Sequence, residues 1–317
     1  MDTNLARAAA PEPEEDFAAS LIAGLSRQPK QLACKFFYDA EGSHLFDAIC
    51  AMPEYYQTRT ELALLVRHAG EIARLIGPDI EIVEFGAGAL TKIRILLDAL
   101  ERPAAYSPLD ISGDYLGQVV RALAGDYPAL TLRPIVADFT QPLAIPALAG
   151  APRRAGFFPG STIGNFRPDA AAALLRRMRA TLNGGGLLIG VDLVKDPRRL
   201  HAAYNDSAGI TEAFNKNLLV RANRDLGADF EPDGFAHYAP YNSAAHRIEM
   251  YLVSLKRQSV HVAGRRFDFA PGEPVHTEDS HKYTIEAFRE LAAHAGFRPR
   301  AVWTDPERLF SLHWLES

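Results

Sequence analysis

The stretch that most constrains the fold is Ile80 to Leu90, which reads IEIVEFGAGAL. A short β-branched run that ends in an acid and is followed by two glycines predicts a buried strand that turns tightly into a helix starting near Leu90. Gly86 and Gly88 allow backbone angles that are closed to other residues. They also let a ligand approach main-chain amides at a helix N-terminus, which carries partial positive charge. The alternative is a plain strand-to-helix turn without a ligand.

The residues around the glycines favour one kind of nucleotide-like ligand. The nicotinamide fingerprint has a third glycine soon after the second, whereas Ala89 and Leu90 follow Gly88 here. Glu84, just before Gly86 at the end of the predicted strand, instead resembles the first motif of the class I methyltransferases that bind S-adenosylmethionine. Because that cofactor has no pyrophosphate, the third glycine is dispensable.

Predicted helices and apolar strands alternate after the glycines. The helix over 90–100 precedes AAYSPLD, the helix over 114–123 precedes LTLRPIVADF, and AGFFPGSTIGNF comes before the helix over 169–182 and NGGGLLIGVDLV. This alternation indicates a parallel sheet that is buried on both faces. Ligands bind such sheets at the carboxyl ends of the strands. Four polar residues fall at these ends: Glu84, Asp110, Asp138 and Asn165.

The pattern changes from Lys195 and changes back at Tyr283. The segment RRLHAAYNDSAGITEAFNKNLLVRANRDL is predicted to be helical, and residues 247–282 read as several strands. The closing part predicts a helix capped by Thr284 and ended by Gly296, followed by two strands.

The expected fold class is therefore α/β, a Rossmann-like sheet of the class I methyltransferase type with a second, inserted α+β lobe. We expect the methyltransferase core in 61–194 plus 283–317 and the substrate lobe in 16–60 plus 195–282. The acidic, proline-containing residues 1–15 are predicted to be a flexible tail.

An adenosyl cofactor would contact several of the residues at the strand ends. The Asp110 carboxylate is placed to accept both ribose hydroxyls, and Asp138 to accept from the adenine amine while Phe139 lines the pocket. Lys92 in the first helical turn would pair with the carboxylate of the cofactor's tail. Each has a simpler interpretation, because the two aspartates could cap helices and Lys92 could be a solvated helix residue. The full cofactor-binding set is Glu84, Gly86, Gly88, Lys92, Asp110, Asp138 and Phe139.

Charge and cysteine content exclude several other functions. The net charge is −5 and no long run of Lys or Arg occurs, which argues against nucleic acid or an anionic membrane as the main partner. Cys34 and Cys50 have no ligand-like spacing, which fits a reducing cytoplasm better than a disulfide framework. No signal pattern or membrane-spanning stretch is visible. A small-molecule substrate is expected, and the oligomeric state stays open, with a monomer plausible.

Longer motifs carry a more specific resemblance. The segments FFYDAEGSHLFDAICAMPEYYQTRTE, FPGSTIGNFRP, DLVKDPRRLHAAYNDSAGITEAFN, RIEM and TEDSHKY resemble the histidine Nα-methyltransferases of ergothioneine biosynthesis, over nearly the whole chain after the first fifteen residues. The resemblance implies three successive methyl transfers from S-adenosylmethionine to the α-amine of L-histidine, which give hercynine.

The resemblance also implies a role for seven residues of this chain. Tyr55, Glu278 and Ser280 would contact the imidazole, and Tyr38 would line the same region. Asn165 and Tyr204 would hold the amino and carboxylate groups. Met250 would pack near the ring. No general base is assigned.

The residues themselves are consistent with an imidazole site. If 275–282 is extended, period-two alternation puts Glu278 and Ser280 on one face, where they offer an acceptor and a hydroxyl to a ring with two nitrogens. An exposed polar edge strand is the plainer alternative. A metal site is a rival because His276, Asp279 and His281 lie nearby, but alternation puts His276 with Glu278 and His281 on the other face, so no metal is expected.

Other functions stay open at this point. The chain could methylate another free amino acid or a nucleobase, although it has PGSTIGNF where base-amine methyltransferases show an Asn/Asp-Pro-Pro-aromatic motif. A nicotinamide-dependent oxidoreductase and a catalytically silent cofactor-binding module are the remaining alternatives.

Overall fold

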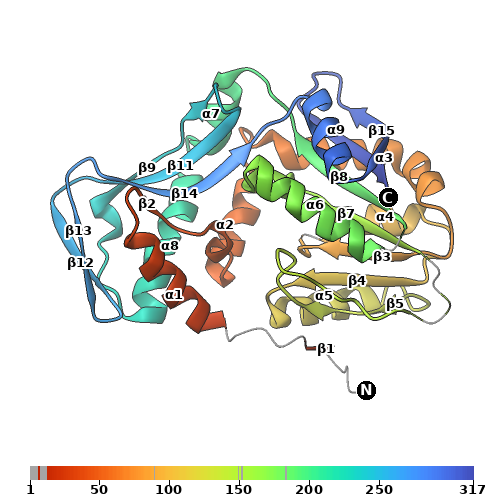
Figure 1. The fold of residues 1–317 in the computed structure, drawn as a ribbon, viewed down its shortest axis with the longest axis horizontal. Coiled ribbons are helices and arrows are strands. Elements are labelled where there is room, and N and C mark those ends of the chain that lie inside the picture. The colour runs from red at the N-terminus through yellow and green to blue at the C-terminus, as the bar shows by residue number, and fades with distance from the viewer. Residues whose placement is uncertain (1–5, 8–12, 89, 149, 151–152, 183) are drawn as a thin grey trace. The chain divides into compact units, whose positions relative to one another are not determined.

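The computed structural model describes residues 6–7, 13–88, 90–148, 150, 153–182 and 184–317 (Figure 1). The chain divides into two compact units. The first comprises Met1–Ala10, Gln57–Leu193 and Tyr283–Ser317, and the second comprises Pro11–Tyr56 and Val194–Lys282. Among the described residues, no helix combines the length and the apolar character needed to cross a bilayer.

The first unit is built on one sheet, with nine strands in the described part of the chain, in the order β1-β6-β4-β3-β7-β8-β16-β15, with β5 beside β4. The strands are β1 (Ala6–Arg7), β3 (Glu81–Phe85), β4 (Ala105–Asp110), β5 (Thr131–Leu132), β6 (Ile135–Val136), β7 (Arg154–Phe158), β8 (Gly186–Asp192), β15 (Arg298–Thr304) and β16 (Phe310–Glu316). Only β16 runs antiparallel to its neighbours. This parallel sheet with a reversed last strand confirms the predicted fold class.

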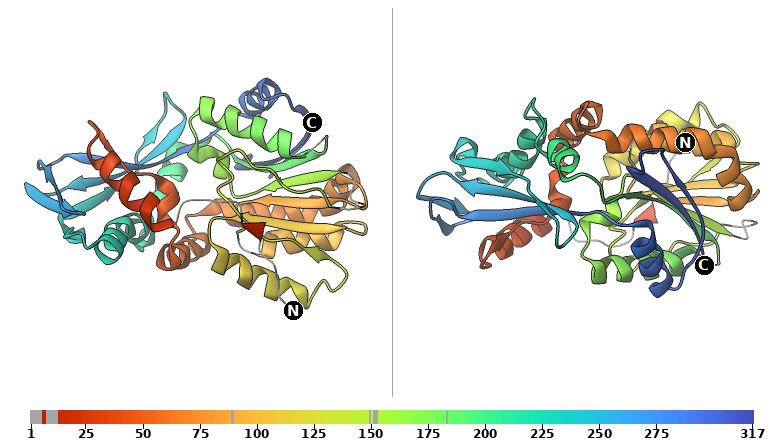
Figure 2. Two further views of the ribbon diagram at one scale, coloured as in Figure 1. Left: turned by 60° about the horizontal axis from the view of Figure 1, so that its bottom comes forward. Right: turned by 90° about the horizontal axis from the view of Figure 1, so that it is seen from above.

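Helices cover both faces of this sheet (Figure 2). One face packs against α3 (Tyr56–Ile76), α4 (Leu90–Ala99) and α5 (Gly113–Ala124), and the other against α6 (Pro168–Leu182) and α9 (Ile285–His294). Ile82 and Val83 are neighbours on β3, and each belongs to a different one of the two cores. Since successive strand side chains point to opposite faces, a strand buried on both sides is mostly apolar, and the two acids of β3, Glu81 and Glu84, are hydrogen-bonded.

Two predicted segments differ from the structure. Of the predicted tail over 1–15, residues 6–7 pair with β6 as a short strand and 13–15 belong to the first helix, while the rest lies outside the described residues. The stretch LTLRPIVADF is split into β5 and β6. Pro134 separates the two pieces, because proline has no main-chain N–H for the ladder.

The second unit has a sheet of five strands, counting described residues, with the order β10-β11-β14-β2 and β9 beside β11, plus the hairpin β12-β13. The strands are β2 (Lys30–Gln31), β9 (Phe235–Tyr238), β10 (Tyr241–Asn242), β11 (Arg247–Ser254), β12 (Gln258–Val262), β13 (Arg265–Phe269) and β14 (Pro274–His281). Its helices are α1 (Pro13–Leu25), α2 (Ala40–Ala51), α7 (Pro197–Tyr204) and α8 (Ile210–Leu226), with 3₁₀ turns η1 (Cys34–Phe37) and η3 (Pro232–Gly234).

The stretch predicted as helical after Lys195 is broken into α7 and α8. The break is stabilised by Asp206, whose carboxylate accepts from the main-chain N–H of Ile210 at 2.9 Å and of Thr211 at 2.8 Å. Gly209 between them has φ of 72°. A carboxylate that accepts from the first amides of a helix stabilises its start, so Asp206 fixes where α8 begins.

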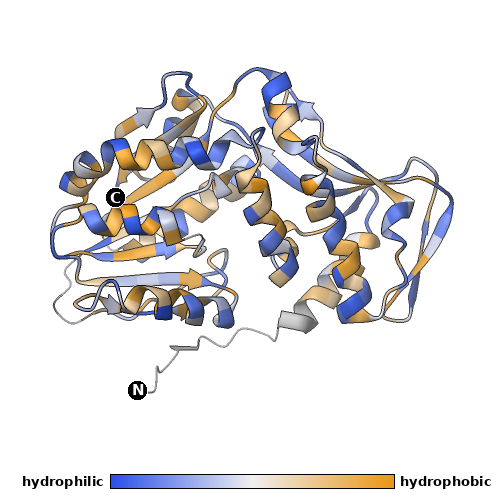
Figure 3. Ribbon diagram, turned by 180° about the vertical axis from the view of Figure 1, so that it is seen from behind, coloured by the Kyte–Doolittle hydropathy of each residue, from blue (hydrophilic) through white to orange (hydrophobic). Residues whose placement is uncertain are grey.

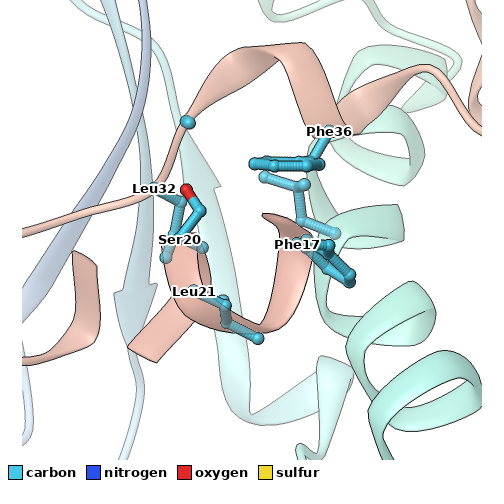
Figure 4. Close-up of a pocket in the computed structure, with 7 residues that line it drawn as sticks. Phe17, Ser20, Leu21, Leu32 and Phe36 are labelled. Carbon is cyan, nitrogen blue, oxygen red and sulfur yellow. The ribbon is translucent and has the colours of Figure 1, made fainter. Parts of the chain in front are cut away.

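Aromatic and aliphatic side chains form the core of the second unit. Phe37 stacks on Phe214 with ring centroids 4.5 Å apart. Close by, the small pocket in Figure 4 is lined by Phe17, Ser20, Leu21, Leu32, Ala33, Phe36 and Leu218. Ser20 supplies the only polar side chain of this lining, so the pocket is a packing gap between α1, η1 and α8 and not a ligand site. Figure 3 shows both blue and orange residues along the helices, as amphipathic packing requires.

Candidate active site

The predicted glycine turn joins β3 to α4. Gly86 has φ of 79°, and a Cβ placed on it would lie 3.3 Å from the Phe139 ring. A glycine is therefore needed at position 86 for two reasons: the backbone angle is unfavourable for other residues, and a side chain there would crowd Phe139. A Cβ on Gly88 would meet nothing within 4 Å. The two glycines thus differ: Gly86 closes the turn, whereas Gly88 leaves open space beside the main chain.

Glu84 stabilises this turn through hydrogen bonds. It is 2% exposed, accepts a hydrogen bond from the Tyr106 hydroxyl, and lies within hydrogen-bond reach of the Gly88 amide. Burial raises the pKa of Glu84 to about 7, against the opposing effects of Tyr106 and of Lys92. Tyr115 supports the turn from α5 by donating to the Gly88 carbonyl at 2.6 Å. Direct contact of Glu84 with a cofactor stays a prediction.

Asp110 and Asp138 lie at neighbouring strand ends. The register pairs Asp110 of β4 with Val136 of β6, and the Ala137 amide donates to the Asp110 carbonyl at 3.0 Å. The Asp110 carboxylate accepts from the Ser112 amide at 2.8 Å, and burial raises its pKa to about 6. Asp138 accepts from the Thr140 amide at 2.8 Å. Both carboxylates therefore order the loops that follow them, and neither caps a helix, since Ser112 caps α5 and no helix begins at Asp138.

Lys92 has a protein partner that the sequence did not indicate. Its Nζ lies 2.6 Å from Oε2 of Glu61, a fully buried residue of α3. The same carboxylate accepts the Gly160 amide at 3.0 and 2.9 Å. An ammonium has three donors, so this pair leaves the predicted role of Lys92 toward a cofactor carboxylate untested, but it shows that Lys92 also helps to fix the loop after β7.

That loop carries Asn165, the last residue of the turn η2 (Thr162–Asn165). Ser161 precedes the turn with φ of 58°, and its Oγ accepts from the Asp192 amide at 2.8 Å. Glu61 binds the loop at Gly160 and Asp192 binds it at Ser161. The half-buried side chain of Asn165 makes no hydrogen bond with any described residue, so its amide is available to a ligand.

The residues of the first unit fit an adenosyl cofactor. Gly88 leaves main chain open to a ligand, and Asp110 offers a partly buried carboxylate with a raised pKa, which hydroxyl donors would satisfy. Phe139 packs on Gly86 and on Phe158, whose ring centroid is 5.6 Å away. This places an aromatic ring directly beside the glycine turn.

The remaining predicted residues lie in the second unit, and β11 and β14 bring three of them together. In this antiparallel pair Met250 lies opposite Glu278, and Ile248 lies opposite Ser280. Since opposite residues share a face, Met250, Glu278 and Ser280 lie on the same buried side of the sheet. Met250 is 2% exposed and lies opposite Glu278, while its predicted contact with the imidazole ring stays a prediction.

Ser280 belongs to a compact hydrogen-bonded triangle. The Tyr204 hydroxyl lies 2.7 Å from Ser280 Oγ, and Lys282 Nζ donates to both oxygens at 2.8 Å. All three side chains are buried. Tyr204 is the last residue of α7, so the helix end and strand β14 are joined by side chains at this point.

Glu278 is the most unusual group of the second unit. It is 8% exposed, and its side chain makes no hydrogen bond or ion pair with any described residue. Burial raises the pKa of Glu278 to about 7, although Lys282 acts in the opposite direction. A buried carboxylate without a donor is costly. It is therefore a candidate partner for an N–H group of a ligand.

Aromatic rings surround these polar groups. Tyr55 lies against Tyr204 with ring centroids 6.3 Å apart, and Phe46 lies 6.3 Å from Tyr55 on its other side. Tyr38 contacts Phe46 at 5.6 Å and is 40% exposed. Burial of its hydroxyl group, and then the charge of Glu278, raise the pKa of Tyr38 well above its usual value. Tyr38, Tyr55, Tyr204, Met250, Glu278 and Ser280 thus form one group.

One predicted detail of β14 is wrong. A bulge between Met250 and Tyr251 of β11 leaves Thr277 without an opposite residue, so that Tyr251 pairs with His276. The bulge reverses the alternation, and His276 shares a face with Asp279, to which it bonds at 3.0 Å. His276 and Glu278 are therefore on opposite faces. Among the described residues, no group of three or more His, Cys, Asp or Glu side chains is arranged to hold a metal.

Two residues of the site were missed. Lys282 follows Glu278 and Ser280 at the same two-residue spacing, and this periodicity could have identified it. Glu61 lies in the middle of an amphipathic helix, where an isolated acid gives no signal. Its partners Lys92 and Gly160 are 31 and 99 residues away in the sequence.

The site can now be compared with known proteins. Residues 17–317 match the profile of a family described as histidine-specific, SAM-dependent methyltransferases. The chain is 42% identical over 311 residues to the histidine N-alpha-methyltransferase of Mycolicibacterium smegmatis, covering 96% of each protein. It is 40% identical over 298 residues to that of Mycobacterium tuberculosis, with 92% of each covered. Ergothioneine biosynthesis protein 1 of Neurospora crassa is 30% identical over 297 residues, which are 87% of this chain and 32% of that protein.

Proposed function

This chain belongs to the histidine-specific, S-adenosylmethionine-dependent methyltransferases, and we propose that it transfers three methyl groups to the α-amine of L-histidine to give hercynine, a step of ergothioneine biosynthesis. The observation that carries the proposal is the buried, unpartnered carboxylate of Glu278 beside the hydroxyl of Ser280. An imidazole N–H supplies the donor that this carboxylate lacks. A reducing cytoplasm suits Cys34 and Cys50, neither of which is in a disulfide.

The cofactor belongs to the first unit in this proposal. Asp110 accepts the ribose hydroxyls, Asp138 and Phe139 contact the adenine, and Gly86, Gly88 and Glu84 form the turn that the amino-acid part approaches. Lys92 pairs with the carboxylate of that part while remaining bound to Glu61. Bound S-adenosylmethionine supplies a methyl group on a positively charged sulfur, which an amine nitrogen attacks.

The substrate residues hold histidine at both ends. Glu278, Ser280 and Tyr55 bind the imidazole, with Met250 and Tyr38 packed around it. Asn165 and Tyr204 bind the amino and carboxylate groups. The protein removes the amine from water, which lowers the pKa of its ammonium form and favours the neutral nitrogen that has a lone pair. No residue is assigned as a general base.

Alignment is the larger contribution of the protein. Fixing the amine against the reacting carbon lowers the barrier by up to about 7–11 kcal/mol in well-oriented systems. Each of the three transfers requires the nitrogen to return to the same position after a methyl group has been added. Hydrogen bonds from Asn165 and Tyr204 supply that orientation, since the ring at the other end is held separately by Glu278.

The proposal is tested by incubating the full chain with S-adenosylmethionine and a mixture of free amino acids, followed by mass spectrometry. We expect a gain of three methyl groups on histidine alone. Methylation of a different amino acid would support the alternative substrate and overturn the histidine assignment. Binding of S-adenosylmethionine by calorimetry without methylation of any amino acid would support a silent cofactor-binding module.

A further inference from the structure

Lys282 is placed to control the hydrogen bonding of the imidazole site. Its side chain is 3% exposed, and Nζ lies 2.8 Å from Tyr204 Oη, 2.8 Å from Ser280 Oγ and 4.7 Å from the centroid of the Tyr204 ring. Its main-chain amide donates to the His246 carbonyl at 2.7 Å. The ammonium therefore touches both hydroxyl oxygens that the strand and α7 bring together.

The three groups lie within hydrogen-bond distance of one another, and their chemistry indicates which of them donates. An ammonium only donates, so both hydroxyl oxygens accept from Lys282. The oxygens of Tyr204 and Ser280 are 2.7 Å apart, and one of them must donate to the other. A phenol is the more acidic hydroxyl, and the oxygen of serine is the better acceptor. Tyr204 therefore donates to Ser280.

This arrangement leaves the Ser280 hydroxyl with one hydrogen-bonding group for a ligand. Its two lone pairs accept from Lys282 and from Tyr204, and only its own O–H is left to bind a ligand. A ring nitrogen that meets Ser280 must then accept a hydrogen bond. The other ring nitrogen carries the N–H, which the Glu278 carboxylate accepts.

The charges around the site also favour a neutral ring over a positively charged one. The ammonium of Lys282 lies 2.8 Å from the Ser280 oxygen, so it would repel a positively charged ring bound to that hydroxyl. Two titratable groups of the second unit interact with Lys282, namely Tyr204 on α7 and Glu278 on β14, and Glu278 in turn interacts with Tyr38, Cys34 and Asp279. Glu278 supplies the one carboxylate on this face, because Asp279 is bound to Arg247 and His276 on the opposite face.

We propose that Lys282 is a positioning residue that turns Ser280 into a hydrogen-bond donor and thereby makes the site select the neutral imidazole of histidine in a single tautomer. The inference rests on the proposed function, since it concerns the ring of the same substrate. Without Lys282, Ser280 could accept a hydrogen bond, and Glu278 with Ser280 would also accommodate an imidazolium.

The test compares KM for histidine at pH 8 and pH 5.5 in the wild type and in Lys282→Met. With an imidazole pKa near 6.5, about a tenth of the substrate is neutral at pH 5.5, so KM of the wild type is expected to rise about 10-fold. In Lys282→Met we expect a higher KM at pH 8 but a rise of about 2-fold or less on acidification. Lys282→Arg, which keeps the charge, restores the larger ratio.

Two controls separate this role from a purely structural one. Tyr204→Phe removes one donor to Ser280 but keeps the positive charge of Lys282, so its ratio of KM values at the two pH values should lie between those of the wild type and Lys282→Met. A triazole analogue of histidine, whose ring stays neutral at pH 5.5, should show only the part of the wild-type ratio that comes from the shared α-amine and from the titration of Glu278, whose pKa is about 7. Thermal unfolding and calorimetry with S-adenosylmethionine confirm that each variant is folded.

The outcomes are distinct. If KM increases by the same factor between pH 8 and pH 5.5 in the wild type and in Lys282→Met, then Lys282 has only a structural role and the inference is overturned. If Lys282→Met does not fold, the wild type can still test the inference with the triazole analogue. An equal increase in KM between pH 8 and pH 5.5 for histidine and for the analogue would also overturn the inference. A wild type that methylates no histidine would instead overturn the proposed function.

Discussion

The cofactor region of the first unit and the imidazole region of the second unit are built in different ways. In the first unit, Glu84, Asp110 and Asp138 lie at the carboxyl ends of β3, β4 and β6, which neighbour one another in the sheet. Their carboxylates bind nearby main-chain amides or a hydroxyl within the same layer. Strand order alone brings these three acids together, and each of them could be predicted from the residues next to it in the sequence.

The imidazole region instead combines side chains from distant segments. Tyr55 precedes α3, Tyr204 ends α7, and Glu278, Ser280 and Lys282 come from the end of β14. Tyr204 and Ser280 are 76 residues apart and 2.7 Å from each other. Glu278 has no partner among the described residues, whereas the carboxylates of the first unit have at least one. The first region is thus ordered by its own main chain, whereas the second contains a buried carboxylate that has no donor among the described residues.

The largest expected effect is in the first unit. Asp110→Ala should weaken S-adenosylmethionine binding by 100-fold or more, because two hydrogen bonds to a charged group, each worth about 1.5–3 kcal/mol, are lost. Calorimetry measures the affinity. Asp114→Ala, which removes an exposed acid from the first turn of α5, is the matched control and should bind normally. Wild-type affinity in Asp110→Ala would exclude the ribose role.

The same contact predicts a pH dependence. Burial raises the pKa of Asp110 to about 6, so the carboxylate is protonated below that pH and loses acceptor strength. Cofactor affinity should therefore be constant above about pH 7 and fall as the pH decreases through 6. Calorimetry between pH 5 and 8 checks this, and the Asp110→Ala variant should not show the decrease.

A substitution in the second unit tests whether the two regions act separately. Glu278→Ala should raise KM for histidine about 10- to 100-fold, since a charged hydrogen bond is lost, and should leave cofactor affinity near normal. Asp279→Asn is the control, because this neighbouring carboxylate lies on the opposite face. Steady-state kinetics decide the comparison. An unchanged KM in a folded Glu278→Ala variant would reject the imidazole assignment.

The unpartnered state of Glu278 also has a consequence for stability. Its pKa is raised from 4.5 to about 7, so burying the ionised form costs stability above pH 4.5, and the cost is complete above pH 7. Glu278→Gln removes this cost, about 3 kcal/mol at pH 8 and none below pH 4.5. Without histidine, the melting temperature of Glu278→Gln relative to the wild type should increase between pH 5 and pH 8. A difference that does not depend on pH would contradict the raised pKa.

The smallest expected effects are those of alanine substitutions at the two glycines of the turn, and they differ between Gly86 and Gly88. Gly86→Ala should destabilise the protein by about 1–2 kcal/mol, because an alanine is strained at φ of 79° and its Cβ approaches Phe139. Gly88→Ala should unfold like the wild type, since its Cβ meets nothing within 4 Å. It should nevertheless weaken S-adenosylmethionine binding. Normal binding by folded Gly88→Ala would mean that the cofactor does not approach this part of the main chain.

Several elements of the fold were predictable because their signals are local. The strand ending at Phe85, the helix starting at Leu90 and the cap at Thr284, which accepts the Ala287 amide at 3.1 Å, all follow from residues close in sequence. The face shared by Glu278 and Ser280 was also predicted from two-residue periodicity. The same rule failed for His276 because the bulge at Thr277 depends on pairing with β11, which lies about 25 residues earlier in the chain.

The sequence by itself determined the alternation of strands and helices, the glycine turn and the carboxylates at the strand ends, because each depends on neighbouring residues and on the repeat of a strand or a helix. Its long motifs also determined the family. Only the tertiary structure decided that Glu61 binds Lys92 and Gly160, that Lys282 joins Tyr204 to Ser280, and that Glu278 is buried without a donor. The physical reason is that hydrogen bonds and burial depend on distances in space, and these pairs are brought together by strand register and helix packing.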